Sequence, residues 1–188
     1  LEGHLSIRRL VHDVQEAGSR ISTLVSNVKT YSHMDRGQDF APVDVHAGLD
    51  STLNLLGFAL RAKRVEVVRD YAPGLPPVPG QAGSLNQVWT NLLDNAIDAL
   101  AAGGGGTITV RTRPEGGFVR VFIIDNGPGI APDVLPRILE PFFTTKPPGE
   151  GSGLGLDIAL RIVEQHGGKL DVQSAPGHTE FCVWLPVG

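Results

Sequence analysis

Apolar and polar residues recur with helical spacing in residues 84–100, SLNQVWTNLLDNAIDAL. One face of this predicted helix is apolar and comprises Leu85, Val88, Trp89, Leu92, Leu93, Ala96, Ala99 and Leu100. The other face is polar without Lys, Arg or Glu, and comprises Ser84, Gln87, Asn91, Asp94, Asn95 and Asp98. Because Asn and Asp are poor helix formers, solvation alone does not explain this face. A ligand-binding helix and an ordinary amphipathic core helix both remain open.

A second apolar pattern lies near the N-terminus, in residues 5–35. Its apolar positions are spaced alternately by three and four, at Ile7, Leu10, Val14, Ala17, Ile21, Leu24, Val28 and Tyr31. This spacing predicts a coiled-coil-type helix that packs on another helix. We expect that partner in a second copy of the chain or in sequence upstream of Leu1. The predicted division is a helical segment, residues 1–37, and a globular domain, residues 38–188.

The globular part is predicted to alternate strands with helices. Strands are expected near residues 40–45, 65–71, 107–113, 118–125, 169–174 and 179–186. Helices are expected at residues 46–62, 84–100 and 154–166. Residues 73–80 form a rigid proline-rich connector, and residues 126–152 form a long connection of the kind that is usually functional. This order predicts an α+β fold, a two-layer α/β sandwich whose mixed sheet carries three helices on one face.

Composition excludes several classes of function. A net charge of -4 gives no electrostatic reason to expect nucleic acid or an acidic membrane as partner. No apolar run approaches the roughly 18 residues of a membrane-spanning helix, so we expect no membrane segment in this chain. Cys182 is the only cysteine, which excludes an intrachain disulfide and favours a reducing compartment. We expect a cytoplasmic location, which membrane attachment of the full-length protein would not contradict.

Two stretches have the chemistry of a phosphate or metal site. Asn91 and Asn95 stand one helical turn apart, and their carboxamide oxygens suit a hard cation such as Mg²⁺. The glycine-rich residues 149–156 open directly into a predicted helix, whose first N–H groups can bind an anion. This is not a Walker A loop, because Leu-Asp follows the last glycine where that loop needs Lys and Ser or Thr. Asp125, at the end of a predicted strand, could simply cap the following turn.

Four motifs follow one another along the chain: NLLDNAIDA at 91–99, DNGPGI at 125–130, PFFTTK at 141–146 and GSGLGL at 151–156. They resemble the N box, first glycine box, F box and second glycine box of the catalytic ATP-binding domain of sensor histidine kinases. The larger group includes type II topoisomerases and mismatch-repair ATPases. The resemblance runs from about residue 40 to the C-terminus and implies the Bergerat fold of the GHKL group. Residues 5–35 resemble the second helix of the family's dimerisation and phosphoacceptor hairpin.

The resemblance implies ATP and Mg²⁺ as cofactors and a role for each matching residue. Asn95 would ligate Mg²⁺, Asn91 would contact the phosphates, and Asp125 would accept a hydrogen bond from the adenine amino group. Lys146 would be the mobile cation for the γ-phosphate, so Asn91 and Lys146 are the candidate catalytic residues. The other residues expected around ATP are Gly127, Gly129, Ile130, Thr144, Thr145, Gly151, Ser152, Gly153, Leu154, Gly155, Leu156 and Thr179. Many family members have a basic residue in place of Asp98, which makes Lys146 more important here.

The implied function is transfer of the ATP γ-phosphate to a histidine of the helical hairpin in a homodimer, followed by relay to a response-regulator receiver domain. An ATP-hydrolysing clamp and a nucleotide-binding module without turnover are the alternatives. Hydrolysing relatives carry Glu where this chain has Asn91, which cannot accept a proton.

The acceptor histidine is expected upstream of Leu1. His12 is followed by Asp13, as in the family's acceptor motif, but Ala17 stands where that motif has Pro. On this interpretation the isolated chain should bind ATP without labelling itself.

Overall fold

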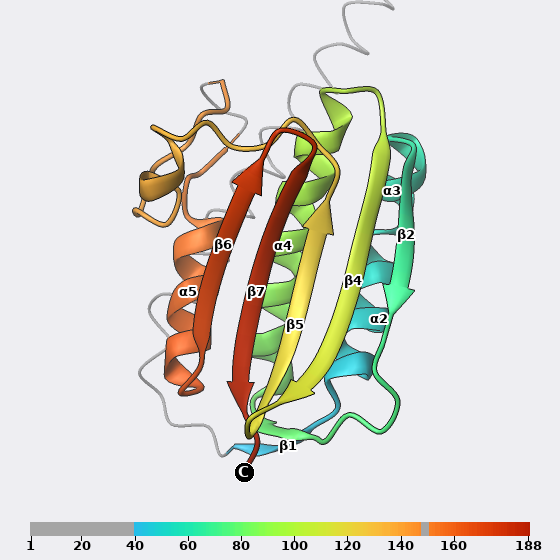
Figure 1. The fold of residues 1–188 in the computed structure, drawn as a ribbon, viewed down its shortest axis with the longest axis vertical. Helices are drawn as coiled ribbons and strands as arrows, with labels where there is room; N and C mark the ends of the chain where they lie inside the picture. The colour runs from blue at the N-terminus through green and yellow to red at the C-terminus, as the bar shows by residue number, and fades with distance from the viewer. Residues whose placement is uncertain (1–39, 148–150) are drawn as a thin grey trace, which may run out of the picture.

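The computed structural model describes residues 40–147 and 151–188, which form a layer of helices packed on one face of a β-sheet (Figure 1). The main sheet has five strands in the order β2-β4-β5-β7-β6. Their bounds are Val65–Asp70 (β2), Gly106–Glu115 (β4), Phe118–Asp125 (β5), Lys169–Ala175 (β6) and His178–Pro186 (β7). β2 pairs with β4 in parallel and the other pairs are antiparallel, so the sheet is mixed. The predicted N-terminal helix and the boundary between residues 37 and 38 lie outside the described residues.

Four α-helices lie on the same face of this sheet: α2 (Val45–Leu55), α3 (Gly57–Ala62), α4 (Ala82–Ala101) and α5 (Gly155–Gln165). The prediction of an α+β sandwich with its helices on one face is therefore confirmed. The prediction of a single helix over residues 46–62 was wrong. The helix is interrupted at Leu56, before Gly57, because glycine is a poor helix former. Within the described part, no helix has both the length and the apolar character required to span a bilayer.

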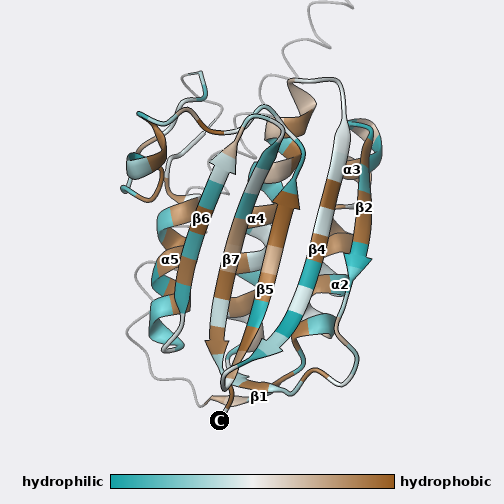
Figure 2. Ribbon diagram, viewed as in Figure 1, coloured by the Kyte–Doolittle hydropathy of each residue, from teal (hydrophilic) through white to brown (hydrophobic). Residues whose placement is uncertain are grey.

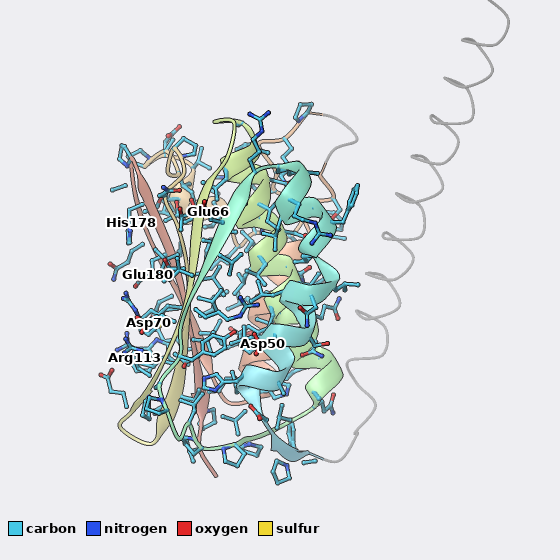
Figure 3. All side chains as sticks on the ribbon, turned by 90° about the vertical axis from the view of Figure 1, so that its right-hand side faces the viewer. Asp50, Glu66, Asp70, Arg113, His178 and Glu180 are labelled. Atoms are coloured by element: carbon cyan, nitrogen blue, oxygen red, sulfur yellow. The ribbon has the colours of Figure 1, made fainter. Side chains whose placement is uncertain are left out.

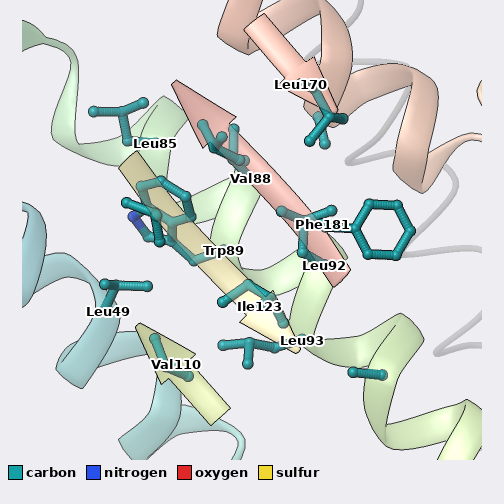
Figure 4. Packing of buried hydrophobic residues seen from close by; sticks show 14 of the residues in the cluster. Leu49, Leu85, Val88, Trp89, Leu92, Leu93, Val110, Ile123, Leu170 and Phe181 are labelled. Atoms are coloured by element: carbon teal, nitrogen blue, oxygen red, sulfur yellow. The ribbon is translucent and has the colours of Figure 1, made fainter. Parts of the chain in front are cut away.

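α4 supplies the centre of the hydrophobic core. Its buried side chains are Leu85, Val88, Trp89, Leu92, Leu93, Ala96, Ile97 and Leu100. Trp89 and Leu93 lie over Ile123 of β5, between the sheet and the helix layer (Figure 4). The predicted apolar face omitted Ile97, which is buried, and included Ala99, which is only partly buried. Because each large buried side chain contributes roughly 1.5–3 kcal/mol, this face fixes the orientation of α4 and turns its polar face away from the sheet.

Two predictions about the N-terminal strands were wrong. Residues 40–45 were expected at an edge of the main sheet, but β1 (Ala41–Val43) pairs with β3 (Val78–Gly80) in a separate two-stranded sheet. β3 lies inside the proline-rich segment that was predicted to be a connector. Pro42 stands opposite Pro79 in this short ladder. Proline is tolerated here because neither strand is central in a larger sheet and the missing N–H groups interrupt no second ladder.

The long connection after β5 contains a single turn of 3₁₀ helix, η1 (Leu135–Arg137), among its described residues. In the β4–β5 hairpin, β4 continues beyond the predicted residues 107–113 to Glu115, and a turn formed by Gly116 and Gly117 joins it to β5. Both glycines have positive φ, 60° and 83°, as such two-residue turns require.

The opposite face of the sheet carries no helix in the described part of the chain, and apolar and polar residues alternate along its strands (Figure 2). Figure 3 shows Asp70, Arg113, His178 and Glu180 on this outer side. Asp70 accepts hydrogen bonds from Nη2 of Arg113, at 2.8 and 2.9 Å, and from Nε of Arg111 at 2.7 Å. These two guanidinium groups hold the pKa of Asp70 below its usual value.

Candidate functional site

Two adjoining cavities lie along the polar face of α4. The first, of about 810 Å³, is lined by α4 and by Gly151–Gly155, and is called here the glycine-loop cavity. The second, of about 880 Å³, is lined by Asp125, Thr179 and the C-terminal half of α4, and is called here the Asp125 cavity. Asn95, Asp98, Thr144 and Lys146 line both. The two cavities therefore form one groove, and each has the size of a small-molecule site.

Asp125 is a buried acidic residue at the wall of its cavity. Its side chain is 4% exposed at the end of β5, and Oδ1 accepts a hydrogen bond of 2.9 Å from the Gly127 N–H. Burial raises the pKa of Asp125, although the Gly127 hydrogen bond opposes this effect. Since Oδ1 is already paired, Oδ2 can accept a hydrogen bond from a ligand. A buried carboxylate beside the apolar side chains of Ile130 and Phe181 suits a planar apolar ligand with a hydrogen-bond donor at its edge.

Thr179 lies beside Asp125, because the two residues are paired in the β5–β7 ladder. Its Oγ1 is 3.0 Å from Oγ of Ser174, which also accepts a hydrogen bond of 2.8 Å from the Ile130 N–H. These contacts connect the loop after β5 to the β6–β7 hairpin. They hold Ile130 at the wall of the Asp125 cavity.

The glycines after Asp125 act through close backbone approach. Gly129 has a φ of 82°, and a Cβ on this residue would lie 2.5 Å from the carbonyl oxygen of Ala175. Gly127 does not line either cavity; a Cβ there would lie 2.7 Å from Oδ1 of Asp125. Its contribution is therefore to orient the Asp125 carboxylate rather than to contact a ligand.

The glycine loop leads into the N-terminus of α5. Gly151, Ser152, Gly153, Gly155 and Leu156 line the glycine-loop cavity. Leu154 does not, because its side chain is 8% exposed and belongs to the hydrophobic core. The first N–H groups of a helix have no partner within the helix, so this end of α5 can bind an anion.

The polar face of α4 supplies two amides to the groove. Nδ2 of Asn91 is buried and has no hydrogen-bond partner within the described residues, while Oδ1 faces Gly155. An unpaired buried donor costs roughly 1–3 kcal/mol, which a ligand oxygen would offset. Asn95, one turn further on, lines both cavities. The described residues include no group of three or more His, Cys, Asp or Glu that could hold a metal. Mg²⁺ still fits here, since it is commonly bound by few protein oxygens together with water and ligand phosphates.

Lys146 and Asp98 lie where the two cavities meet, since both residues line both cavities. Nζ of Lys146 donates a hydrogen bond of 2.5 Å to Oδ2 of Asp98, and Nζ of Lys63 donates one of 2.5 Å to Oδ1. Burial would raise the pKa of Asp98, but the hydrogen bonds from the two lysines lower it below its usual value. Burial and the neighbouring Asp98 charge raise the pKa of Asp94.

The groove brings together most of the predicted ATP-contacting residues. Those that line it are Asn91, Asn95, Asp125, Gly129, Ile130, Thr144, Thr145, Lys146, Gly151, Ser152, Gly153, Gly155, Leu156 and Thr179. Lys63, Asn86 and Thr90 also line it and were not predicted. Asn86 and Thr90 precede Asp94 and Asp98 at intervals of four residues and could have been found from that spacing; Lys63 is in no motif.

No histidine among the described residues lines either cavity. The groove can therefore bind an anionic ligand with a planar apolar end, but its described walls offer no imidazole as a nucleophile. Asn91 and Asn95 are also unable to accept a proton as a general base.

Proteins with assigned functions are similar to this chain in sequence and in fold. The sensory histidine kinase/phosphatase NtrB of Rhodobacter capsulatus is 40% identical over 181 residues, which cover 89% of this chain and 49% of that protein. This chain therefore spans about half the length of that relative. A structure of full-length ShkA in complex with AMPPNP is 30% identical with a TM-score of 0.81, covering 95% of this chain and 38% of that one.

A second structural match is the histidine kinase ThkA in complex with the response regulator protein TrrA. It is 25% identical with a TM-score of 0.75, covering 93% of this chain and 49% of that one. Residues 80–188 match the family model described as histidine kinase-, DNA gyrase B-, and HSP90-like ATPase, and this range includes all four sequence motifs. The resemblance stated from the motifs is thereby confirmed, and the chain belongs to this ATPase family.

Proposed function

We propose that this chain is the ATP-binding catalytic domain of a sensor histidine kinase. The observation that carries the proposal is the continuous groove along α4, with Asp125 at one end, the glycine loop at the other, and Asn95 and Lys146 where the two cavities meet. An apolar end with one buried acceptor and an opposite end rich in backbone N–H groups is complementary to a purine nucleotide with its phosphates.

In this proposal the adenine occupies the Asp125 cavity and the phosphates extend toward the N-terminus of α5. Oδ2 of Asp125 accepts a hydrogen bond from the adenine amino group, and Ile130 packs on the ring. Nδ2 of Asn91 donates to a phosphate oxygen, which would satisfy its orphaned hydrogen-bonding capacity. Asn95 would hold Mg²⁺, which neutralises phosphate charge when bound.

The transfer step needs a nucleophile from outside the described groove. A histidine nitrogen attacks the γ-phosphorus in line; the N–P bond forms as the bond to the bridging β,γ oxygen breaks, and ADP leaves with that oxygen's charge. Lys146 lies where a cation can stabilise the charge that develops during this step. Because Asn91 cannot accept a proton from water, the groove favours transfer to such a nucleophile over hydrolysis.

The proposed macromolecular partners are the dimerisation and phosphoacceptor hairpin, in a homodimer, and a response-regulator receiver domain. Support comes from the relatives: NtrB and PprA are a sensory histidine kinase and a two-component sensor, and ThkA forms a complex with a response regulator protein. Use of ATP as phosphate donor favours a cytoplasmic location.

The test is phosphotransfer to a hairpin supplied separately. The chain is incubated with γ-labelled ATP, Mg²⁺ and the isolated dimerisation hairpin of Rhodobacter capsulatus NtrB, a relative of 40% identity. We expect acid-labile, alkali-stable label on the hairpin, lost when its acceptor histidine is replaced by glutamine. Release of labelled phosphate without labelled hairpin would instead support an ATP-hydrolysing clamp. A third outcome is that ATP binds but neither labelled hairpin nor free phosphate forms. If the same outcome is obtained with the hairpin encoded by this protein's own gene, it would support a nucleotide-binding module without turnover.

A further inference from the structure

Asp98 is an acidic residue in the middle of a groove proposed to bind an anion. It lines both cavities, one turn of α4 beyond Asn95, and its two carboxylate oxygens are each 2.5 Å from a lysine Nζ. Lys146 lies in the long connection after β5. Lys63 is the C-cap residue that directly follows α3. The side chains of Lys63, Asp98 and Lys146 are 38%, 38% and 34% exposed, so none is sealed in this arrangement.

The charges along the groove are not favourable to an anion. Its ionisable lining residues are Asp94, Asp98, Asp125, Lys63 and Lys146, a formal excess of one negative charge among the described residues. A phosphate oxygen would compete with the Asp98 carboxylate for the ammonium group of Lys146. If Lys146 turned toward a phosphate and Asp98 had no other partner, an unpaired carboxylate would face the incoming polyphosphate.

We propose that Lys63 is a binding determinant for the nucleotide phosphates, because it keeps Asp98 paired and so allows Lys146 to exchange Asp98 for a phosphate oxygen. This inference rests on the proposed function, since it takes the ligand of the groove to be a nucleoside triphosphate. Lys63 acts through Asp98 and does not contact the ligand; it is a positioning residue. The ion pairs select for ligands that carry phosphates, since only these give Lys146 a second partner.

Ligands of different phosphate content separate this role from general support of the fold. Titration calorimetry with Mg·ATP, Mg·ADP and adenosine compares the wild type with Lys63→Met. We expect about tenfold weaker binding of Mg·ATP, a smaller loss for Mg·ADP and less than about a twofold change for adenosine. Arg61→Met is the matched control, because Arg61 is exposed on α3 and lines neither cavity; it should change Mg·ATP affinity less than about twofold.

If Lys63→Met lowered the affinity for all three ligands equally, Lys63 would only support the groove walls. If the affinity for Mg·ATP were unchanged, Asp98 would not require Lys63 as a partner during nucleotide binding. Either result would overturn the inference. Failure of the wild type to bind Mg·ATP would instead contradict the proposed function.

A double-mutant cycle with Asp98 tests the mechanism itself. In an Asp98→Asn background there is no carboxylate to keep paired, so Lys63→Met should change Mg·ATP affinity less than about twofold. If Lys63→Met still lowered Mg·ATP affinity tenfold in this background, Lys63 would contact the phosphates directly. The proposal that Lys63 acts by keeping Asp98 paired would then be wrong. Thermal unfolding of each variant verifies that the compared proteins are folded.

Discussion

At the scale of single residues, Asp125 combines a cost to the folded protein with a function. Its carboxyl is buried at the end of β5, and burial raises its pKa. An acid with a raised pKa in the folded state costs stability once the pH is above both its unfolded and its folded pKa. The ligand-free protein therefore bears this cost in full at any pH above the folded pKa of Asp125. A hydrogen bond from a ligand to the ionised Oδ2 would recover part of it.

Asp125→Asn should separate these two effects. The amide keeps an oxygen to accept the Gly127 N–H but removes the buried charge, so we expect the melting temperature of the ligand-free protein to rise at neutral pH. Mg·ATP binding should weaken about tenfold or more, because a charged acceptor is lost and the amide can present its NH₂ to the adenine. Scanning calorimetry and titration calorimetry measure the two quantities.

Asp133→Asn is the control, since Asp133 is exposed and lines neither cavity. Equal affinity of the wild type for ATP and GTP would rule out the adenine contact of Asp125.

Asn95→Ala tests the predicted metal ligand. The side chain lies on the polar face of α4, so its truncation opens no cavity in the core and should leave the melting temperature nearly unchanged. ATP affinity in the presence of Mg²⁺ should fall to the value measured with EDTA, because the amide oxygen that holds the metal is missing. Asn54→Ala, the same truncation on the exposed side of α2, should keep the Mg²⁺ dependence of the wild type. Retained Mg²⁺ dependence in Asn95→Ala would remove Asn95 from the metal site.

At the scale of elements, the sequence predicted best those helices and strands in which one apolar periodicity continues over many residues. α4 and the strands β4, β5 and β7 were found because their apolar positions repeat over eight or more residues. β1 and β3 have three residues each and contain proline, so a local pattern is too short to identify their pairing. The break at Leu56 depends on one glycine between two short helical stretches.

The candidate site was predictable to the extent that it lies in motifs. The four boxes gave Asn91, Asn95, Asp125 and Lys146, all of which line the groove. Lys63 could not be found in this way, because its partner Asp98 is 35 residues away and only the tertiary fold brings the two side chains together. Leu154 was included as part of a motif, but its side chain packs in the core.

The glycine loop before α5 depends for its shape on Gly153. Gly153 has a φ of 66°, and a Cβ there would lie 2.4 Å from the carbonyl carbon of Phe142. Gly153→Ala should lower stability by about 1–2 kcal/mol from the unfavourable φ and also displace the loop, weakening Mg·ATP binding. Gly116→Ala is the control, since Gly116 also has positive φ, 60°, but has no neighbour within 4 Å of a Cβ. It should lose stability while binding Mg·ATP normally; equal affinity of the two variants would contradict the proposed loop geometry.

His166 connects the end of α5 to the start of α4. Its side chain is 6% exposed, Nδ1 lies 2.7 Å from the Ile162 carbonyl oxygen, and Nε2 accepts a hydrogen bond of 3.1 Å from the Gln81 N–H. Burial lowers the pKa of His166 below 6.5, although the Ile162 carbonyl opposes this effect. A base with a lowered pKa contributes stability that is present above the unfolded pKa and lost as the pH falls through about 6.5 toward the folded value.

The melting temperature of the wild type should therefore decrease between pH 7.5 and pH 5 more steeply than that of His166→Gln, which does not titrate in this range. Parallel pH profiles for the two proteins would exclude His166 as a source of the slope.

At the scale of the whole molecule, the groove and the histidine that would receive the phosphate belong to different parts of the protein. The described histidines, His46, His166 and His178, line neither cavity. In the proposed function, nucleotide binding is a property of the described fold, whereas transfer also requires a docked hairpin. Substitutions in the groove should consequently differ in whether they change the affinity for ATP or the rate of transfer.

Lys146→Ala is predicted to act mainly on the rate. In the ligand-free structure Lys146 is bound to Asp98, so part of its attraction to a phosphate is offset by the contact it must give up. Its net contribution to ground-state affinity should be limited to about tenfold, the same loss that is expected when Lys63→Met leaves Lys146 on Asp98. In the transition state more negative charge develops near the leaving oxygen, and a preorganised cation there contributes about a hundredfold in rate.

The initial rate of hairpin labelling at saturating ATP, set beside the ATP dissociation constant from calorimetry, measures both effects. Lys169→Ala is the control, because Lys169 is exposed on β6 and paired with Asp171 away from the groove. It should change neither quantity. If Lys146→Ala lowered the ATP affinity but left the labelling rate at saturating ATP unchanged, Lys146 would bind the ground state and the transition state equally. The cation that stabilises the transition state would then have to come from the docked hairpin.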